Sequence, residues 1–202
     1  MENVEKFPRV LIISHNSVSD TRNNGKTILS FLSDWDSESI AQIYKTNEWP
    51  DTDKCRKYFH ITDKDILKAF IEKRVTAGRE FTNEDKPNKE AVATGNNTLR
   101  DIFRKRIPIL MCVQNYIWKH SWQSEQLFKW IENFAPQAIF LQCSLPAIDR
   151  IAVQLSKKYD VPLFFEITDD YVSPKLSIDP FFWLYYSRIV DATREAINKS
   201  KK

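Results

Sequence analysis

The sequence has 202 residues, 42% of them hydrophobic and 28% charged, which is the composition of a folded globular protein and excludes a disordered chain. Its net charge of +3, from 30 basic and 27 acidic residues, gives a weak overall field and no general case for binding nucleic acid. The length suits one domain with a substantial core, so we expect a single domain over residues 1–202.

The pattern of cysteine, histidine and apolar residues indicates an intracellular protein without a metal or cofactor. Cys55, Cys112 and Cys143 match no zinc or redox spacing, which is typical of reduced thiols, and His60 and His120 have no partner at a metal-ligand spacing. The N-terminus lacks the features of a signal peptide, and the longest apolar runs fall short of the roughly 20 residues of a membrane helix. We therefore expect a cytoplasmic protein, at most peripheral to the inner face of the membrane.

The first half of the chain alternates apolar runs with amphipathic stretches. Residues 10–13 are a continuous branched run, typical of a strand buried on both faces, and a polar loop then leads to a predicted helix at 26–35. Strands are predicted at 40–44 and 58–61, followed by a helix at 63–74 that Thr62 caps. Residues 76–97 contain two of the three glycines and no periodic apolar positions, which predicts a mobile insertion.

The second half continues the alternation. Helices are predicted at 98–120, with an interruption at Pro108, and at 124–134, 146–158 and 180–202; strands are predicted at 138–141 and 162–167. Strands that alternate with helices imply right-handed crossovers, so the sequence predicts an α/β fold with a Rossmann-like parallel sheet and helices on both faces. Ligands bind such sheets at the carboxyl ends of the strands, which selects residues 14–26, 142–144 and 168–171 as candidates.

The segment Asn24-Gly25-Lys26-Thr27 is similar to the end of a phosphate-binding P-loop. The P-loop spacing puts its first glycine at position 20, where this chain has Asp20, so a nucleotide triphosphatase is disfavoured. Gly25 would still let the amides at the helix start approach an anion closely. The alternative is a helix start that packs against a strand. His15, in the same loop, could contact a ligand, although a structural role is favoured for a lone histidine.

Two further segments each have a functional and a structural interpretation. The carboxylates of Asp169 and Asp170, beside Thr168, suit sugar hydroxyls or a general base, but the residues alone favour capping of a turn. Basic residues at 100–106 precede the apolar run 107–110 and suit an anionic membrane surface, although a solvated helix face is favoured. Aromatic residues at 181–186 suggest packing, or an interface with more protein.

Three segments together resemble the N-terminal half of a GT-B glycosyltransferase of the family 4 type, which is frequent in bacterial surface polysaccharide synthesis. They are RVLIIS (9–14), NNGKT (23–27) and VPLFFEITDDY (161–171). The resemblance implies two Rossmann-like domains across a cleft, of which this chain is a truncated acceptor-side domain, inactive alone, without the C-terminal nucleotide-sugar domain. A non-catalytic α/β binding or regulatory module is the alternative.

The resemblance also assigns roles to individual residues. It implies sugar transfer from a nucleotide-diphosphate donor to a glycan or lipid-linked acceptor hydroxyl. Asn24, Gly25 and Lys26 match the family's loop that lies near the donor phosphates and the acceptor. His15, Thr27 and Thr168 are further candidates for substrate or phosphate binding because they lie at the same predicted crevice. Asp169 or Asp170 would orient hydroxyls, and Thr168 stands where relatives often have a histidine.

Overall fold

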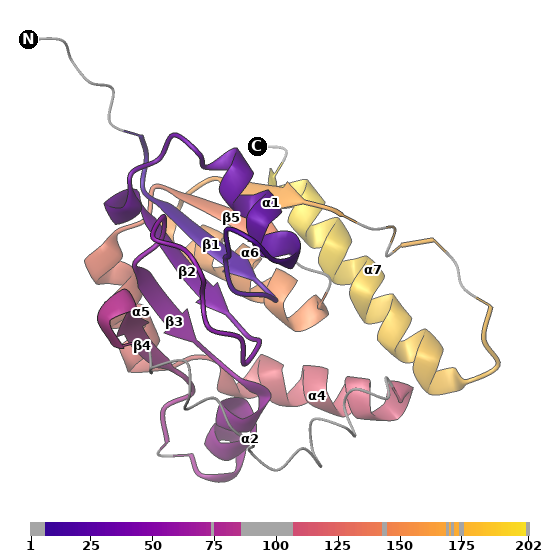
Figure 1. The fold of residues 1–202 in the computed structure, drawn as a ribbon. Coiled ribbons are helices and arrows are strands. Elements are labelled where there is room, and N and C mark those ends of the chain that lie inside the picture. The colour runs from indigo at the N-terminus through magenta and orange to yellow at the C-terminus, as the bar shows by residue number, and fades with distance from the viewer. Residues whose placement is uncertain are drawn as a thin grey trace, which may run out of the picture.

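The computed structural model describes residues 7–73, 75–85, 107–142, 145–168, 170, 172–173 and 176–200. At its centre lies a six-stranded sheet with the strand order β4-β3-β2-β1-β5-β6 (Figure 1). The strands are β1 (Val10–Ser14), β2 (Ile40–Tyr44), β3 (Lys57–His60), β4 (Arg79–Thr82), β5 (Ala138–Gln142) and β6 (Leu163–Glu166).

Five of the strands are parallel, and β1 and β2 are buried along their whole length. Continuous burial is what helices on both faces of a parallel sheet impose, and it explains the unbroken apolar runs of these strands. The predicted Rossmann-like α/β fold is confirmed, and each of its five predicted strands lies within one residue of the observed one.

The prediction of a mobile insertion at 76–97 was wrong for its first part. Residues 79–82 form β4, which pairs antiparallel with β3 at the edge of the sheet. Phe81 fixes this strand, because its ring is buried and stacks on Tyr58 at 5.0 Å between ring centroids. Gly78 precedes β4 with φ at +85°, a conformation that glycine adopts without strain. Residues 86–97 lie outside the described residues.

Helices cover both faces of the sheet. They are α1 (Asn23–Phe31), α2 (Asp63–Ile71), α4 (Pro108–Ser121), α5 (Glu125–Phe134), α6 (Pro146–Tyr159) and α7 (Pro180–Ser200), with short 3-10 turns η1 (Ser37–Ser39) and η2 (Asn83–Asp85). In Figure 1, α1 lies in front of the sheet and α6 behind it. The apolar face of α1 packs with Val10 and Ile12, whereas α5 and α6 pack with Leu11 and Ile13.

The helix boundaries follow local signals with small shifts. Thr62 caps α2 as predicted, in a reciprocal capping box with Asp65. This helix ends at Ile71, three residues before the predicted end, and α1 begins at Asn23 instead of Lys26. The helix predicted at 98–120 corresponds in its second part to α4. Its first part, residues 98–106, lies outside the described residues.

Asp149 places a carboxyl in the core. It lies on the first turns of α6 with no exposed surface, and neither carboxylate oxygen has a hydrogen-bond partner among the residues that the structure describes. Burial raises the pKa of the Asp149 carboxyl well above its usual range, and the neighbouring Arg150 offsets this only in part. The side chain is therefore expected to be protonated in the folded protein at acidic pH.

This burial predicts a stability that falls as the pH rises. The folded protein holds the Asp149 proton more tightly than the unfolded chain does. From about pH 4 upward, Asp149 therefore ionises in the unfolded chain while it stays protonated in the folded protein, and this stabilises the unfolded state relative to the folded one. The free energy of unfolding should fall by at most ~1.4 kcal/mol per pH unit from this group. Urea unfolding between pH 4 and 8 should show a shallower fall for Asp149→Asn.

A matched control for this prediction is Asp191→Asn. It makes the same substitution at an exposed position on α7, so it shows whether the loss of a carboxylate alone changes the pH profile. If the free energy of unfolding changed with pH in the same way for the wild type and for Asp149→Asn, this would contradict the claim that burial raises the pKa of the Asp149 carboxyl.

Candidate functional site

The order of the strands selects one edge of the sheet as the place for a ligand. From β1 the chain proceeds to β2 on one side, and later to β5 on the other, so the direction of strand addition reverses between β1 and β5. Parallel strands β1, β5 and β6 end at the same edge. In open α/β sheets the crevice at such a reversal, outside the carboxyl ends, is where ligands bind.

Five register partners form the last row of the sheet at this edge, which we call the rim row. The row consists of His60, Tyr44, Ser14, Gln142 and Glu166, one from each parallel strand. Partners in register project to the same face of a sheet, and Tyr44 packs in the core on the α1 side. The rim row therefore places polar or aromatic side chains across five strands on the face that α1 covers.

Hydrogen bonds fix the half of the rim row nearest the reversal point. The Gln142 side-chain amide donates from Nε2 to Glu166 Oε2 at 2.6 Å, which joins the ends of β5 and β6. Gln142 is buried and Glu166 is half-buried, so this pair holds a carboxylate at the border between core and solvent. A carboxylate held in this way can accept hydrogen bonds from ligand hydroxyls.

The other half of the rim row is aromatic and packed. His60 stacks on Tyr44 at 4.5 Å between ring centroids, and its Nε2 donates to the Thr46 carbonyl oxygen at 2.7 Å. Burial lowers the pKa of His60, which favours the neutral ring. This histidine stabilises the end of β3 and is not a candidate for acid–base chemistry.

Gln42 holds the loop that follows β1, and sequence reasoning did not select it. Its Oε1 accepts from the Val18 backbone N–H at 3.0 Å, and its Nε2 donates to Ser14 Oγ at 2.7 Å and to the Asn16 carbonyl oxygen at 2.9 Å. All three distances indicate good hydrogen bonds, and the side chain is fully buried. A polar residue inside the apolar strand of residues 40–44 is the signal that could have identified it.

Gly25 lies in close contact with this same loop. It is buried at the start of α1, where a Cβ atom would stand 2.4 Å from the Ser17 carbonyl oxygen and 2.8 Å from the Ser19 backbone nitrogen. The close backbone approach that the sequence predicts at Gly25 is therefore made to the protein's own loop. No contact in the structure tests whether Gly25 binds phosphate, so that role stays a prediction.

The other predicted residues of this region lie around Gly25. Asn24, Lys26 and Thr27 are exposed on the first turns of α1, so their side chains are accessible to a ligand. His15 is half-buried, and its backbone carbonyl oxygen accepts from the amides of Lys45 and Thr46 at 3.2 and 3.0 Å. The structure thus places these residues on the loop and helix that follow β1.

The predicted carboxylates after β6 are described only in part. Thr168 is exposed two residues after β6, and Asp169 lies outside the described residues. The Asp170 carboxylate accepts hydrogen bonds from the Val172 and Ser173 amides at 3.1 and 2.9 Å and from the Ser173 hydroxyl. Asp170 therefore caps a turn, as the residues alone favoured, and its catalytic assignment stays a prediction.

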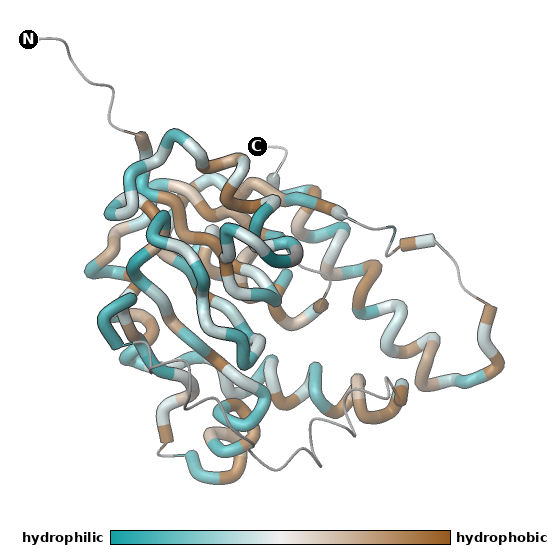
Figure 2. The backbone as a smooth tube through the Cα atoms, viewed as in Figure 1, coloured by the Kyte–Doolittle hydropathy of each residue, from teal (hydrophilic) through white to brown (hydrophobic). Residues whose placement is uncertain are grey.

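Apolar side chains are exposed at the starts of α4 and α7. Ile109 on α4 and Phe181, Trp183 and Leu184 on α7 are each 42–45% exposed, and Figure 2 shows apolar residues at the start of α4 and along α7. The basic residues at 100–106 lie outside the described part of the chain, so the predicted membrane contact stays a prediction. Among the described helices, none combines the length and the apolar character that crossing a bilayer requires.

Comparison of the chain with protein-family models, curated proteins and solved structures gave no match. The candidate site therefore depends on the geometry of the carboxyl edge. The functional hypothesis rests on the ends of β5 and β6 and on the residues that follow β1 and β6.

Proposed function

We propose that this chain is the acceptor-side domain of a glycosyltransferase that moves a sugar from a nucleotide-diphosphate donor to an acceptor hydroxyl, in the synthesis of a bacterial surface polysaccharide. The observation that supports this most is the Gln142–Glu166 pair of the rim row, beside the point where the strand order reverses. The sequence resemblance to the N-terminal half of GT-B enzymes is consistent with that placement.

The proposed reaction assigns a role to each side of the edge. The acceptor oxygen forms a bond to the anomeric carbon, the bond from that carbon to the diphosphate breaks, and the nucleoside diphosphate leaves with the electron pair. The hydroxyl proton passes to a carboxylate, for which Glu166 is the half-buried candidate. Lys26, exposed at the N-terminal end of α1, would stabilise the negative charge of the leaving group together with the helix dipole.

The test is acceptor-dependent release of nucleoside diphosphate by the protein from its complete reading frame. UDP-, GDP-, ADP- and dTDP-sugars are supplied with oligosaccharide or polyprenyl-phosphate-linked acceptors. We expect turnover with one donor, and losses of about 10²-fold for Lys26→Ala and for Glu166→Gln, which is the scale for removing a group that stabilises transition-state charge. Lys129→Ala, an exposed change on α5, should leave turnover unchanged.

Two results would count against the proposal. Full turnover in both Lys26→Ala and Glu166→Gln would remove these residues from the mechanism. Absence of turnover with every donor, while a ligand still binds at the carboxyl edge, would favour the non-catalytic binding or regulatory module.

A further inference from the structure

The sheet is covered on only one face where β6 forms its edge. The face toward α1 carries the even-numbered residues of β1, β5 and β6, and α1 packs there on Val10 and Ile12. On β6, Leu163 and Phe165 pack in the cluster on the other face, whereas Phe164 projects to the α1 side and is 57% exposed. Parallel sheets are normally covered on both faces, so this exposed ring marks a surface that is open to a partner.

Three phenylalanine rings lie on this surface, which we call the aromatic face. Phe140 of β5 is the register partner of Phe164 and is half-buried. Phe31, the last residue of α1, is 55% exposed, and its ring lies 5.9 Å from that of Phe140 between centroids. Each of the other described helices contributes buried residues to the cluster on the opposite side of the sheet. The aromatic face is therefore a strip of accessible rings beside α1.

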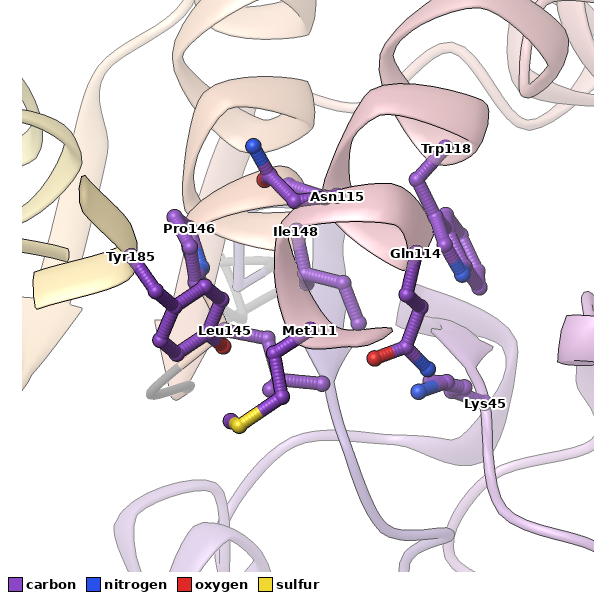
Figure 3. Close-up of a pocket in the computed structure, with 10 residues that line it drawn as sticks. Lys45, Met111, Gln114, Asn115, Trp118, Leu145, Pro146, Ile148 and Tyr185 are labelled. Atoms are coloured by element: carbon purple, nitrogen blue, oxygen red, sulfur yellow. The ribbon is translucent and has the colours of Figure 1, made fainter. Parts of the chain in front are cut away.

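The opposite side of the sheet is closed next to the same carboxyl edge. Trp118 of α4, Ile148 of α6 and Tyr185 of α7 are all buried there, around a small pocket (Figure 3). The pocket has room for about one water molecule. The positive charge beside it is already neutralised, because Lys45 Nζ lies 3.0 Å from Asp63 Oδ2. A ligand that contacts the sheet near this edge must therefore approach from the α1 side.

Polar groups continue the aromatic face toward the carboxyl edge. Gln142 and Glu166 follow Phe140 and Phe164 by two residues, so they project to the same side, about 7 Å farther along the strands. Glu166 Oε2 accepts from Gln142 Nε2, while Glu166 Oε1 has no hydrogen-bond partner in the part of the chain that the structure describes. The surface thus joins flat apolar rings to a carboxylate oxygen that can still accept a hydrogen bond.

This combination suits a carbohydrate better than a covering helix. A sugar ring has an apolar C–H face, which packs on aromatic rings, and a rim of hydroxyl groups, which donate to carboxylates. Successive rings of a glycan would lie on Phe31 and Phe164 while a hydroxyl reaches Glu166. A helix with an apolar stripe would instead bury the Glu166 carboxylate without a donor, which costs free energy. The same charge repels an anionic chain, so the glycan that fits is uncharged.

We propose that the aromatic face binds an uncharged glycan, with ring C–H surfaces on Phe164, Phe140 and Phe31 and a hydroxyl that donates to Glu166 Oε1. The inference rests on the proposed function for the role of this glycan as the acceptor, because its terminal hydroxyl would lie beside the carboxylate that takes the proton. It also narrows the acceptor to a saccharide chain longer than a single ring. The binding itself depends only on the surface.

The experiment is isothermal titration of the chain with cellohexaose, maltohexaose, mannohexaose and chitohexaose, and with hexagalacturonate as the anionic probe. We expect at least one neutral oligosaccharide to bind and hexagalacturonate not to bind. Phe164→Leu should weaken the binding about fivefold, because the ring contact is lost while most of the apolar area is kept. A covering helix or a second copy would tolerate this change, since leucine retains the apolar surface.

Phe70→Leu is the matched control. It makes the same change at a 40%-exposed position on α2, and its oligosaccharide binding should equal that of the wild type. Phe164 is exposed, so Phe164→Leu is expected to fold, and thermal unfolding checks this.

The outcomes separate this inference from the proposed function. Absence of binding by every neutral oligosaccharide, preference for hexagalacturonate, or equal binding by Phe164→Leu would overturn the assignment of the aromatic face. Light scattering that shows a dimer which Phe164→Glu dissociates would also overturn it, because a second copy would then cover the rings. None of these results alters the measured release of nucleoside diphosphate. Oligosaccharide binding that depends on Phe164, in a protein without turnover, would leave the aromatic face as a glycan site and reject the transferase.

Discussion

Gly25→Ala should destabilise the protein by roughly 3 kcal/mol, at the upper end of the usual cost of overpacking. The added Cβ would meet the Ser17 carbonyl oxygen at 2.4 Å and the Ser19 nitrogen at 2.8 Å. Both atoms are backbone, and Gln42 holds the same loop by three hydrogen bonds, so neither side yields easily. Urea unfolding at neutral pH would measure the loss.

Lys26→Ala provides the matched control for this prediction. Lys26 is the next residue of α1 and is exposed, so its truncation should change the free energy of unfolding by less than about 0.5 kcal/mol. Equal unfolding midpoints for Gly25→Ala and the wild type would show that the loop does not contact Gly25 as described. Since Gly25→Ala is expected to disturb folding, a loss of activity in that variant would not demonstrate ligand contact at Gly25.

Asp63→Ala is the second change with a large expected effect, about 2 kcal/mol of lost stability. Asp63 is the common acceptor for Lys45, Gln114 and Trp118, and its removal leaves the buried Lys45 ammonium without its partner. The cost is kept below that of a fully buried pair because the Asp63 side chain is 32% exposed. The measurement is the urea unfolding midpoint, supported by near-ultraviolet circular dichroism of the tryptophans.

The partner change Lys45→Met should cost less, about 1 kcal/mol or below, because it removes the buried charge and leaves Asp63 with two donors and access to water. Which of the two substitutions costs more stability tests whether Asp63 is the acceptor that Lys45, Gln114 and Trp118 share. A larger loss for Lys45→Met than for Asp63→Ala would contradict the role of Asp63 as the shared acceptor.

Local signals were sufficient for most of the fold. The run Val10–Ile13 is apolar at every position because both sheet faces are covered, and its short length and branched residues favour a strand over a buried helix segment. The edge strand β4 was missed for the opposite reason. Of its four residues only Phe81 is buried, and its strand conformation comes from pairing with β3 and stacking on Tyr58, neither of which is visible locally.

The sequence was sufficient to predict which edge of the sheet holds the candidate site. It was not sufficient to predict the contacts between the side chains at that edge. The order of strands and helices places the loops after β1, β5 and β6 at one edge by a general rule. The alignment of Ser14, Gln142 and Glu166 in one row depends on the register between strands, which the sequence pattern leaves open. The turn of Asp170 was the favoured structural interpretation, whereas the packing of Gly25 on the loop required the three-dimensional contact.

The most direct test of the account is to map where a ligand binds, by amide chemical shifts of the ¹⁵N-labelled chain titrated with the neutral oligosaccharides and with nucleotide sugars. We expect shifts confined to the carboxyl edge and the adjoining aromatic face, in residues 14–31, 45–46, 140–142 and 164–168. Shifts centred on β4, or at the amino ends of the strands around residues 7–9 and 135–138, would contradict a ligand site at the carboxyl ends of β1, β5 and β6.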